Sequence, residues 1–138
     1  ALGLLLVFRT NASYDRFWEG RKLWGGIVNE TRNLIRSSEA FLINEPDIRR
    51  EISLWTVAFA YSTMNSLRDK KGLGPHTQGL DQEKVEKALA SPHPALYVAK
   101  QISLLLQKAK LAGHITDYAQ ATVDQNVQQL VDYLGGCE

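Results

Sequence analysis

The amino-acid sequence predicts an all-α protein that begins with one long helix. Apolar residues recur every three or four positions through most of the 138 residues, which is the spacing of helices with one buried face. All four Pro residues fall between these stretches or at their starts, where Pro is tolerated. No stretch alternates apolar and polar residues between turn residues, as a half-buried strand would. We therefore divide the chain into a long N-terminal helix, residues 1–43, and a second helical region, residues 44–138.

The first predicted helix spans residues 1–43 because this segment contains no Pro. Pro46 ends it, since Pro disfavours helical backbone at the residue before it. Gly25 and Gly26 predict a bend within this helix.

An apolar run, residues 1–8, opens this helix without a capping residue before it. Eight helical residues span about 12 Å, less than half of a hydrocarbon layer of roughly 30 Å. Two interpretations remain open: a core helix of a soluble protein with a processed N-terminus, or the last turns of a membrane helix leaving the bilayer. We expect the second, and with it a chain that is a piece of a larger membrane protein.

Capping residues, Pro and Gly divide residues 44–138 into four helices separated by short loops. The predicted segments are a helix from Pro46 to about residue 71, a loop at 72–80, a helix from the Asp81 cap to Ser91, a helix from Pro94 to Gly113, and a helix from the Thr116 cap to Gly135 and Gly136. Residues at helical spacing predict the buried faces of the three longer helices. They are Ile48, Ile52, Trp55 and Phe59 in the first, Leu96, Ala99, Ile102, Leu106 and Ala109 in the next, and Val123, Val127, Leu130, Val131 and Leu134 in the last.

Composition and spacing give little support to catalysis, metal binding or nucleic-acid binding. The formal net charge is +1, so no bulk positive charge attracts a nucleic acid. His76, His93 and His114 lie at no metal-ligand spacing with one another or with a cysteine or carboxylate. Cys137 is the single cysteine, so the chain forms no internal disulfide. We expect no enzyme activity, no metal and no cofactor.

The most informative segment is residues 4–24, where the apolar run changes abruptly to a mixture of cations and aromatic rings. Such residues at the end of a membrane helix mark its boundary with water, and an excess of Lys and Arg marks the cytoplasmic side. The residues concerned are Arg9, Tyr14, Arg16, Phe17, Trp18, Arg21, Lys22 and Trp24.

One face of this helix carries Leu4 and Phe8, one turn apart, and continues through Asn11, Asp15 and Glu19. An apolar stripe followed by a polar one suits a pore that narrows at Leu4 and Phe8. Below them the pore would widen into a wet vestibule.

Ordinary salt bridging along one helix is the alternative explanation of these charges. Glu19 lies three residues after Arg16 and three before Lys22, which is the spacing of helical ion pairs. Each pair is worth only roughly 0.2–0.5 kcal/mol. Spacing alone favours this explanation over the pore.

Residues 8–25 closely resemble the signature of the bestrophin family, and residues 130–138 are also similar to it. The first stretch reads FRTNASYDRFWEGRKLWG and the second reads LVDYLGGCE. The resemblance is nearest to the bacterial and plant-chloroplast branch, which includes voltage-dependent chloride channels. Between the two stretches only the helical pattern and the length agree.

The resemblance implies a homopentameric ion channel in a membrane, in which five copies of the second membrane helix surround a hydrophobic neck. By position, Leu4 and Phe8 match two of the three bulky apolar residues that line this neck. Both should therefore be exposed when one chain is viewed alone. The residues that would line the vestibule or an interface between subunits are Asn11, Asp15, Arg16 and Glu19.

The permeant ion implied is chloride or another small anion, and the acidic calcium clasp of animal members is not recognisable in this sequence. The full-length protein would cross a bacterial inner membrane or a thylakoid membrane several times, with most of residues 1–138 on the cytosolic or stromal side. Two alternatives stay open. One is a cation-selective bacterial member of the family, since Asp15 and Glu19 do not favour anions. The other is a soluble all-α scaffold or interaction module.

Overall fold

The chain folds into helices, as predicted. The computed structural model describes residues 2–137, except for the side chains of residues 2, 5, 6, 8–10, 13 and 137. No strand occurs within residues 2–137. The helices are α1 (Leu2–Phe41), α2 (Pro46–Leu67), α3 (Gln82–Ala90), α4 (Pro94–Leu111) and α5 (Asp117–Cys137), with a short 3-10 helix η1 (Thr77–Gly79) between α2 and α3.

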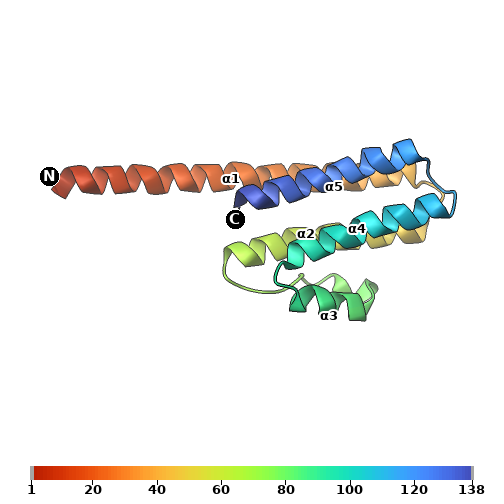
Figure 1. Cartoon of the computed structure of the whole chain (residues 1–138). Helices are drawn as coiled ribbons and strands as arrows, with labels where there is room; N and C mark the ends of the chain where they lie inside the picture. Colours follow the sequence, from red (N-terminus) through yellow and green to blue (C-terminus); the bar gives the residue numbers. More distant parts are fainter. Residues whose placement is uncertain (1, 138) are drawn as a thin grey trace.

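Helix α1 is far longer than the helices it packs against, with 40 residues compared with 21 in α5. Figure 1 shows α5 running antiparallel beside the second half of α1, while α2 and α4 form a second layer and α3 lies outside it. Helix α1 contacts α5 and α2, and α4 contacts α2, α5 and α3. The first half of α1 projects beyond all the other helices (Figure 1).

One hydrophobic core joins the second half of α1 to the other long helices. The largest fully buried side chains come from four helices and the turn after α1, and they recur at the spacing that amphipathic helices predict. They include Ile27, Leu34, Leu42, Ile52, Phe59, Ile102, Leu106, Val123 and Leu130.

Most predicted helix starts and stops are confirmed, because they depend on local chemistry. The Asp81 carboxylate accepts a hydrogen bond from the Glu83 N–H at 3.0 Å, which is a standard N-cap contact. The Thr116 hydroxyl accepts one from the Ala119 N–H at 3.1 Å. Gly113 ends α4 with a φ of 80°, a left-handed conformation that glycine adopts without strain.

Two predicted helix ends are wrong. Helix α2 stops at Leu67 rather than near residue 71, because Asp69 turns the chain with a φ of 54°. The Asn65 side chain then holds the departing loop by donating from Nδ2 to the Gly72 carbonyl at 3.0 Å. Helix α5 continues to Cys137 instead of ending at Gly135 and Gly136.

The bend predicted at Gly25 and Gly26 is absent, since α1 is one continuous helix through both residues and shows no kink there (Figure 1). Gly26 has a packing role instead. A Cβ atom added to it would overlap the Tyr133 ring of α5. The glycine therefore permits close approach of two helices rather than a bend between two segments.

Leu96 is the one residue of the predicted α4 stripe that is not buried, with 48% of its surface exposed. It lies in the first turn of α4, where the buried positions are Ala95 and Val98. These two residues share the face that continues through Ile102 and Leu106. In its first turn, the buried face of α4 therefore lies slightly to one side of the predicted stripe.

Candidate pore-lining segment of helix α1

The first half of α1 presents apolar side chains to solvent. Leu4 is 62% exposed and Val7 is 55% exposed. The prediction that Leu4 is exposed in a single chain is therefore confirmed. The backbone of Phe8 belongs to the same helix, but its side chain lies outside the described part of the structure.

The polar residues predicted to follow the apolar stripe are also exposed. Asn11, Asp15 and Glu19 recur at intervals of four residues along α1, and Arg16 lies beside them. From Leu4 to Glu19 a helix rises about 22 Å. The structure therefore places these predicted residues along one stretch of helix that no other part of the described chain covers.

Salt bridging does not account for the charges in this stretch. The ion pairs found between described residues lie elsewhere: Lys87 with Glu83, Lys110 with Asp117, and His114 with Glu45. Neither Arg16 nor Lys22 forms an ion pair with Glu19 in this part of the chain. Asp15, Arg16, Glu19 and Lys22 are all exposed, and none of the ion pairs between described residues includes them.

Three aromatic side chains form a cluster on the same exposed stretch. The rings of Tyr14 and Trp18 meet edge to face with centroids 5.9 Å apart, and those of Phe17 and Trp18 do so at 6.2 Å. Each ring is at least 43% exposed. Together with Leu4 and Val7, they make an apolar surface of the kind that protein or membrane partners cover.

The polar contact that fastens α1 to the bundle was missed by sequence reasoning. The buried Glu30 carboxylate accepts hydrogen bonds from Asn33 Nδ2 and from Asn126 Nδ2 of α5, both at 3.3 Å. With its amide nitrogen turned toward Glu30, Gln129 reaches the same carboxylate at 2.7 Å. A sequence signal existed, because Glu30 falls between Ile27 and Leu34 at the spacing of the buried face.

Neither a metal centre nor a membrane-crossing helix is found among residues 2–137. No three His, Cys, Asp or Glu side chains gather there at metal-binding distance. No helix in this range combines the length and the apolar character that crossing a membrane requires.

Comparison with known proteins gives this arrangement a family context. All 138 residues match the family of bacterial and fungal bestrophin proteins. Two relatives are called voltage-dependent anion channel-forming proteins. The protein from Nostoc sp. is 38% identical over 141 residues, and the one from Synechocystis sp. is 39% identical over 142 residues. Each alignment covers 99% of this chain but only 46% of the relative.

Solved structures agree with the sequence match. A crystal structure of a bacterial bestrophin homologue from Klebsiella pneumoniae is 32% identical, with a TM-score of 0.85. The alignment covers 98% of this chain and 50% of the Klebsiella chain. The chain thus spans about half the length of the relatives it matches. Because the family match covers every residue and the fold agrees, the chain belongs to the bacterial and fungal bestrophin family.

Proposed function

We propose that this chain forms part of a membrane anion-channel subunit, with the first half of α1 contributing to the wall of the pore. The observation that carries this proposal is the exposed apolar surface around Leu4, which projects beyond the bundle without a partner in the described chain. The names of the Nostoc and Synechocystis relatives, both anion channel-forming proteins, support the same function.

In this proposal Leu4 and Phe8 form two rings of a hydrophobic neck in a homopentamer. Apolar side chains offer no polar ligand to replace the hydration shell of an ion. A narrow ring of them therefore loses its water and blocks conduction, whereas a wider ring passes hydrated ions. A small rotation of α1 or of the Phe8 side chain would be enough to switch between these states.

The remaining parts of the chain have roles that follow from this neck. Residues 1–43 would form the lower part of the pore helix and its extension, and residues 44–138 a helical region on the cytosolic or stromal side. The full-length subunit would cross the membrane several times. The residues proposed to line the vestibule or a subunit interface are Asn11, Asp15, Arg16 and Glu19. Membership of this family favours a channel over an enzyme and over a soluble scaffold.

A cation-selective pore is a second candidate, because two carboxylates of the exposed stretch favour it. Asp15 and Glu19 lie one turn apart and both are exposed, so rings of these residues would attract cations. The exposed Arg16 beside them acts in the opposite direction. We place chloride or another small anion first because the named relatives form anion channels.

Planar-bilayer recording of the full-length protein in asymmetric KCl tests both parts of the proposal. We expect a reversal potential close to that of chloride, and a value close to that of potassium would overturn the anion assignment. Phe8→Ala removes most of one apolar ring, so we expect a higher open probability or conductance. Currents identical to those of the wild type would exclude Phe8 from the neck.

A further inference from the structure

Helices α1 and α5 each carry a pair of adjacent glycines where they meet, and their contact uses only one glycine of each pair. A Cβ atom added to Gly26 would overlap a side chain of α5, and one added to Gly136 would crowd a side chain of α1. At Gly25 and Gly135, an added Cβ atom would have no neighbour within 4 Å. A glycine inside a helix is destabilising relative to alanine, and close approach of another helix is a common reason to keep one. Gly25 and Gly135 have no such helix within the described chain.

Gly25 lies on a face of α1 that no other helix of the described chain covers. Exposed residues recur on this face every three or four positions, namely Trp18, Lys22, Gly25, Asn29, Arg32 and Arg36. Within residues 20–36 the only carboxylate is that of Glu30, which is buried against α5. The cations of this face form no ion pair with any described residue. We call this surface the basic face.

Helix α5 has an uncovered face of the opposite charge. Its 21 residues include aspartates but no Lys, Arg or His. Exposed residues at helical spacing line this face, namely Ala121, Gln125, Gln128, Asp132 and Gly135. The Asp132 carboxylate forms no ion pair with a described residue, and an open groove of about 440 Å³ lies between it and the glutamines. We call this surface the acidic face.

The basic and acidic faces do not meet within one chain, although α1 and α5 are neighbours. Other residues make the contact between the two helices, and both faces are exposed beside it. Gly26 contacts Tyr133 in this antiparallel pair, so Gly25 and Gly135 lie within about one residue, or 1.5 Å, of the same height along α1 (Figure 1). The two open glycines and the two faces therefore occupy the same stretch of the bundle.

The charges on the two faces also match in height. By the same register, Asp132 lies about five residues, or 7.5 Å along the helix axis, from both Lys22 and Arg32. The long side chains of Lys and Arg can close much of this distance. Arg32 also lies level with Gln128 to within about one residue. Positive charge therefore stands opposite carboxylate and amide oxygens when the two faces approach each other at equal height.

We propose that the basic face of α1 packs against the acidic face of α5 in the next copy of the chain, and that this contact closes the ring of subunits. This interface presupposes the homopentamer of the proposed function. Copies in such a ring are related by rotation about one axis, so the register within one chain also holds between chains whose α1 helices run along that axis. A contact between two different faces repeats head to tail around the ring. A second copy is the partner because the chain itself supplies both complementary faces.

Disulfide cross-linking of the full-length protein in detergent tests this interface, with Cys137 and any other native cysteine replaced by serine. Asn29→Cys combined with Gln128→Cys should give a ladder of covalently linked subunits on mild oxidation, because these positions lie on the two faces within about two residues of equal height. The matched control combines Asn29→Cys with Glu86→Cys. Glu86 is exposed on α3, outside the second layer, so we expect no ladder (Figure 1).

Charge reversal measures the same contact without a cross-link. Asp132→Lys and Arg32→Glu should each raise the protein concentration needed for assembly by about tenfold or more, because each places like charges across the interface. The double variant exchanges the two charges, so it should assemble at a lower concentration than either single variant. Mass photometry gives the oligomeric state. A double variant that assembles no better than the single variants would overturn the proposed pairing of faces.

The outcomes separate this interface from the proposed channel. A wild-type protein that stays monomeric in detergent would overturn both the homopentamer and the interface. An intact wild-type oligomer without a ladder from Asn29→Cys with Gln128→Cys, or with an equal ladder from the Glu86→Cys control, would overturn the interface alone. The side chains replaced for cross-linking or charge reversal are all exposed, so lost assembly would not reflect a lost core contact.

Discussion

The two halves of α1 share one backbone conformation but have opposite surroundings. Every residue from 3 to 22 whose burial is described is exposed, including Leu4 and Trp18. In the second half, Ile27 and Leu34 are completely buried. The change occurs where α5 begins to cover the helix, at the contacts of Leu23 with Gly136 and of Gly26 with Tyr133.

This difference shows that the apolar residues of one helix serve two purposes. In the second half they hold the bundle together. In the first half they form a surface without an intramolecular partner, which a soluble monomer seldom keeps. Substitutions in the second half should therefore change stability, and substitutions in the first half should change conduction or assembly.

The largest expected contrast is between Leu34→Ala and Leu4→Ala. Leu34 is fully buried, so its truncation leaves a cavity and should lower the free energy of unfolding by about 2–5 kcal/mol. Leu4 is 62% exposed, so Leu4→Ala should change the free energy of unfolding by less than about 0.5 kcal/mol. Denaturant unfolding of the chain, followed by circular dichroism, measures both. Equal losses at the two positions would mean that the first half of α1 packs against its own chain.

The next contrast uses two adjacent glycines at the border between the halves. Gly26→Ala would place a Cβ atom against the Tyr133 ring, and such overpacking should cost about 1–3 kcal/mol. Gly25 has no neighbour within 4 Å of an added Cβ atom, so Gly25→Ala should be neutral or stabilise the helix by up to about 1 kcal/mol. If α5 packs as described, the midpoint temperature of thermal unfolding should fall in Gly26→Ala and stay the same or rise in Gly25→Ala. Stabilisation by Gly26→Ala would contradict this packing.

Local chemistry explains why the helix order was predictable from the sequence. Pro46 and Pro94 start helices, Asp81 and Thr116 cap them, and Gly113 ends one, and each of these signals acts within a few residues. The exposure of Leu4 was predicted from the resemblance to the bestrophin family, in which its partners would be the same residues of other subunits. Of the predictions that failed, the ends of α2 and α5 were misplaced by a few residues, whereas the bend at Gly25 and Gly26 failed because of a contact made by the folded chain.

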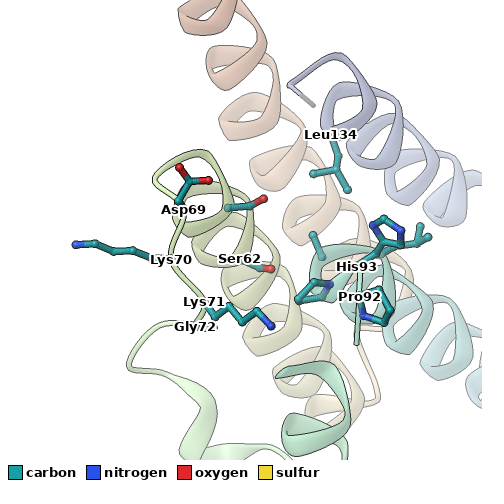
Figure 2. Close-up of a pocket in the computed structure, with 12 residues that line it drawn as sticks. Ser62, Asp69, Lys70, Lys71, Gly72, Pro92, His93 and Leu134 are labelled. Atoms are coloured by element: carbon teal, nitrogen blue, oxygen red, sulfur yellow. The ribbon is translucent and has the colours of Figure 1, made fainter. Parts of the chain in front are cut away.

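Tertiary contacts decided the features that the sequence did not reveal. Gly26 looked like a site for a bend, but its role depends on Tyr133, which lies over a hundred residues later. The hydrogen bond between Glu30 and Asn126 joins residues 96 positions apart. The cleft lined by Ser62 of α2 and His93 and Ala95 at the start of α4 likewise needs α2 and α4 side by side (Figure 2). Periodicity identifies a buried face, but it does not identify the residues that cover it.

The smallest expected contrast is between two glutamates on the same face of α1. Glu19 and Glu30 are about three turns apart, so they point in nearly the same direction. Glu30→Gln replaces one carboxylate oxygen with a donor that faces the amides of Asn33 and Asn126, and should cost about 1 kcal/mol. Glu19→Gln should leave stability within about 0.5 kcal/mol, because that side chain is exposed.

Denaturant unfolding at neutral pH compares the two glutamate variants directly. Because the residue type, the helix and the face are the same, the difference between them reports only whether α5 covers the position. If Glu19→Gln lowers the free energy of unfolding as much as Glu30→Gln does, or more, Glu30 contributes no specific contact. In that case apolar packing alone, through Ile27, Leu34 and the close approach at Gly26, would hold the projecting helix to the bundle.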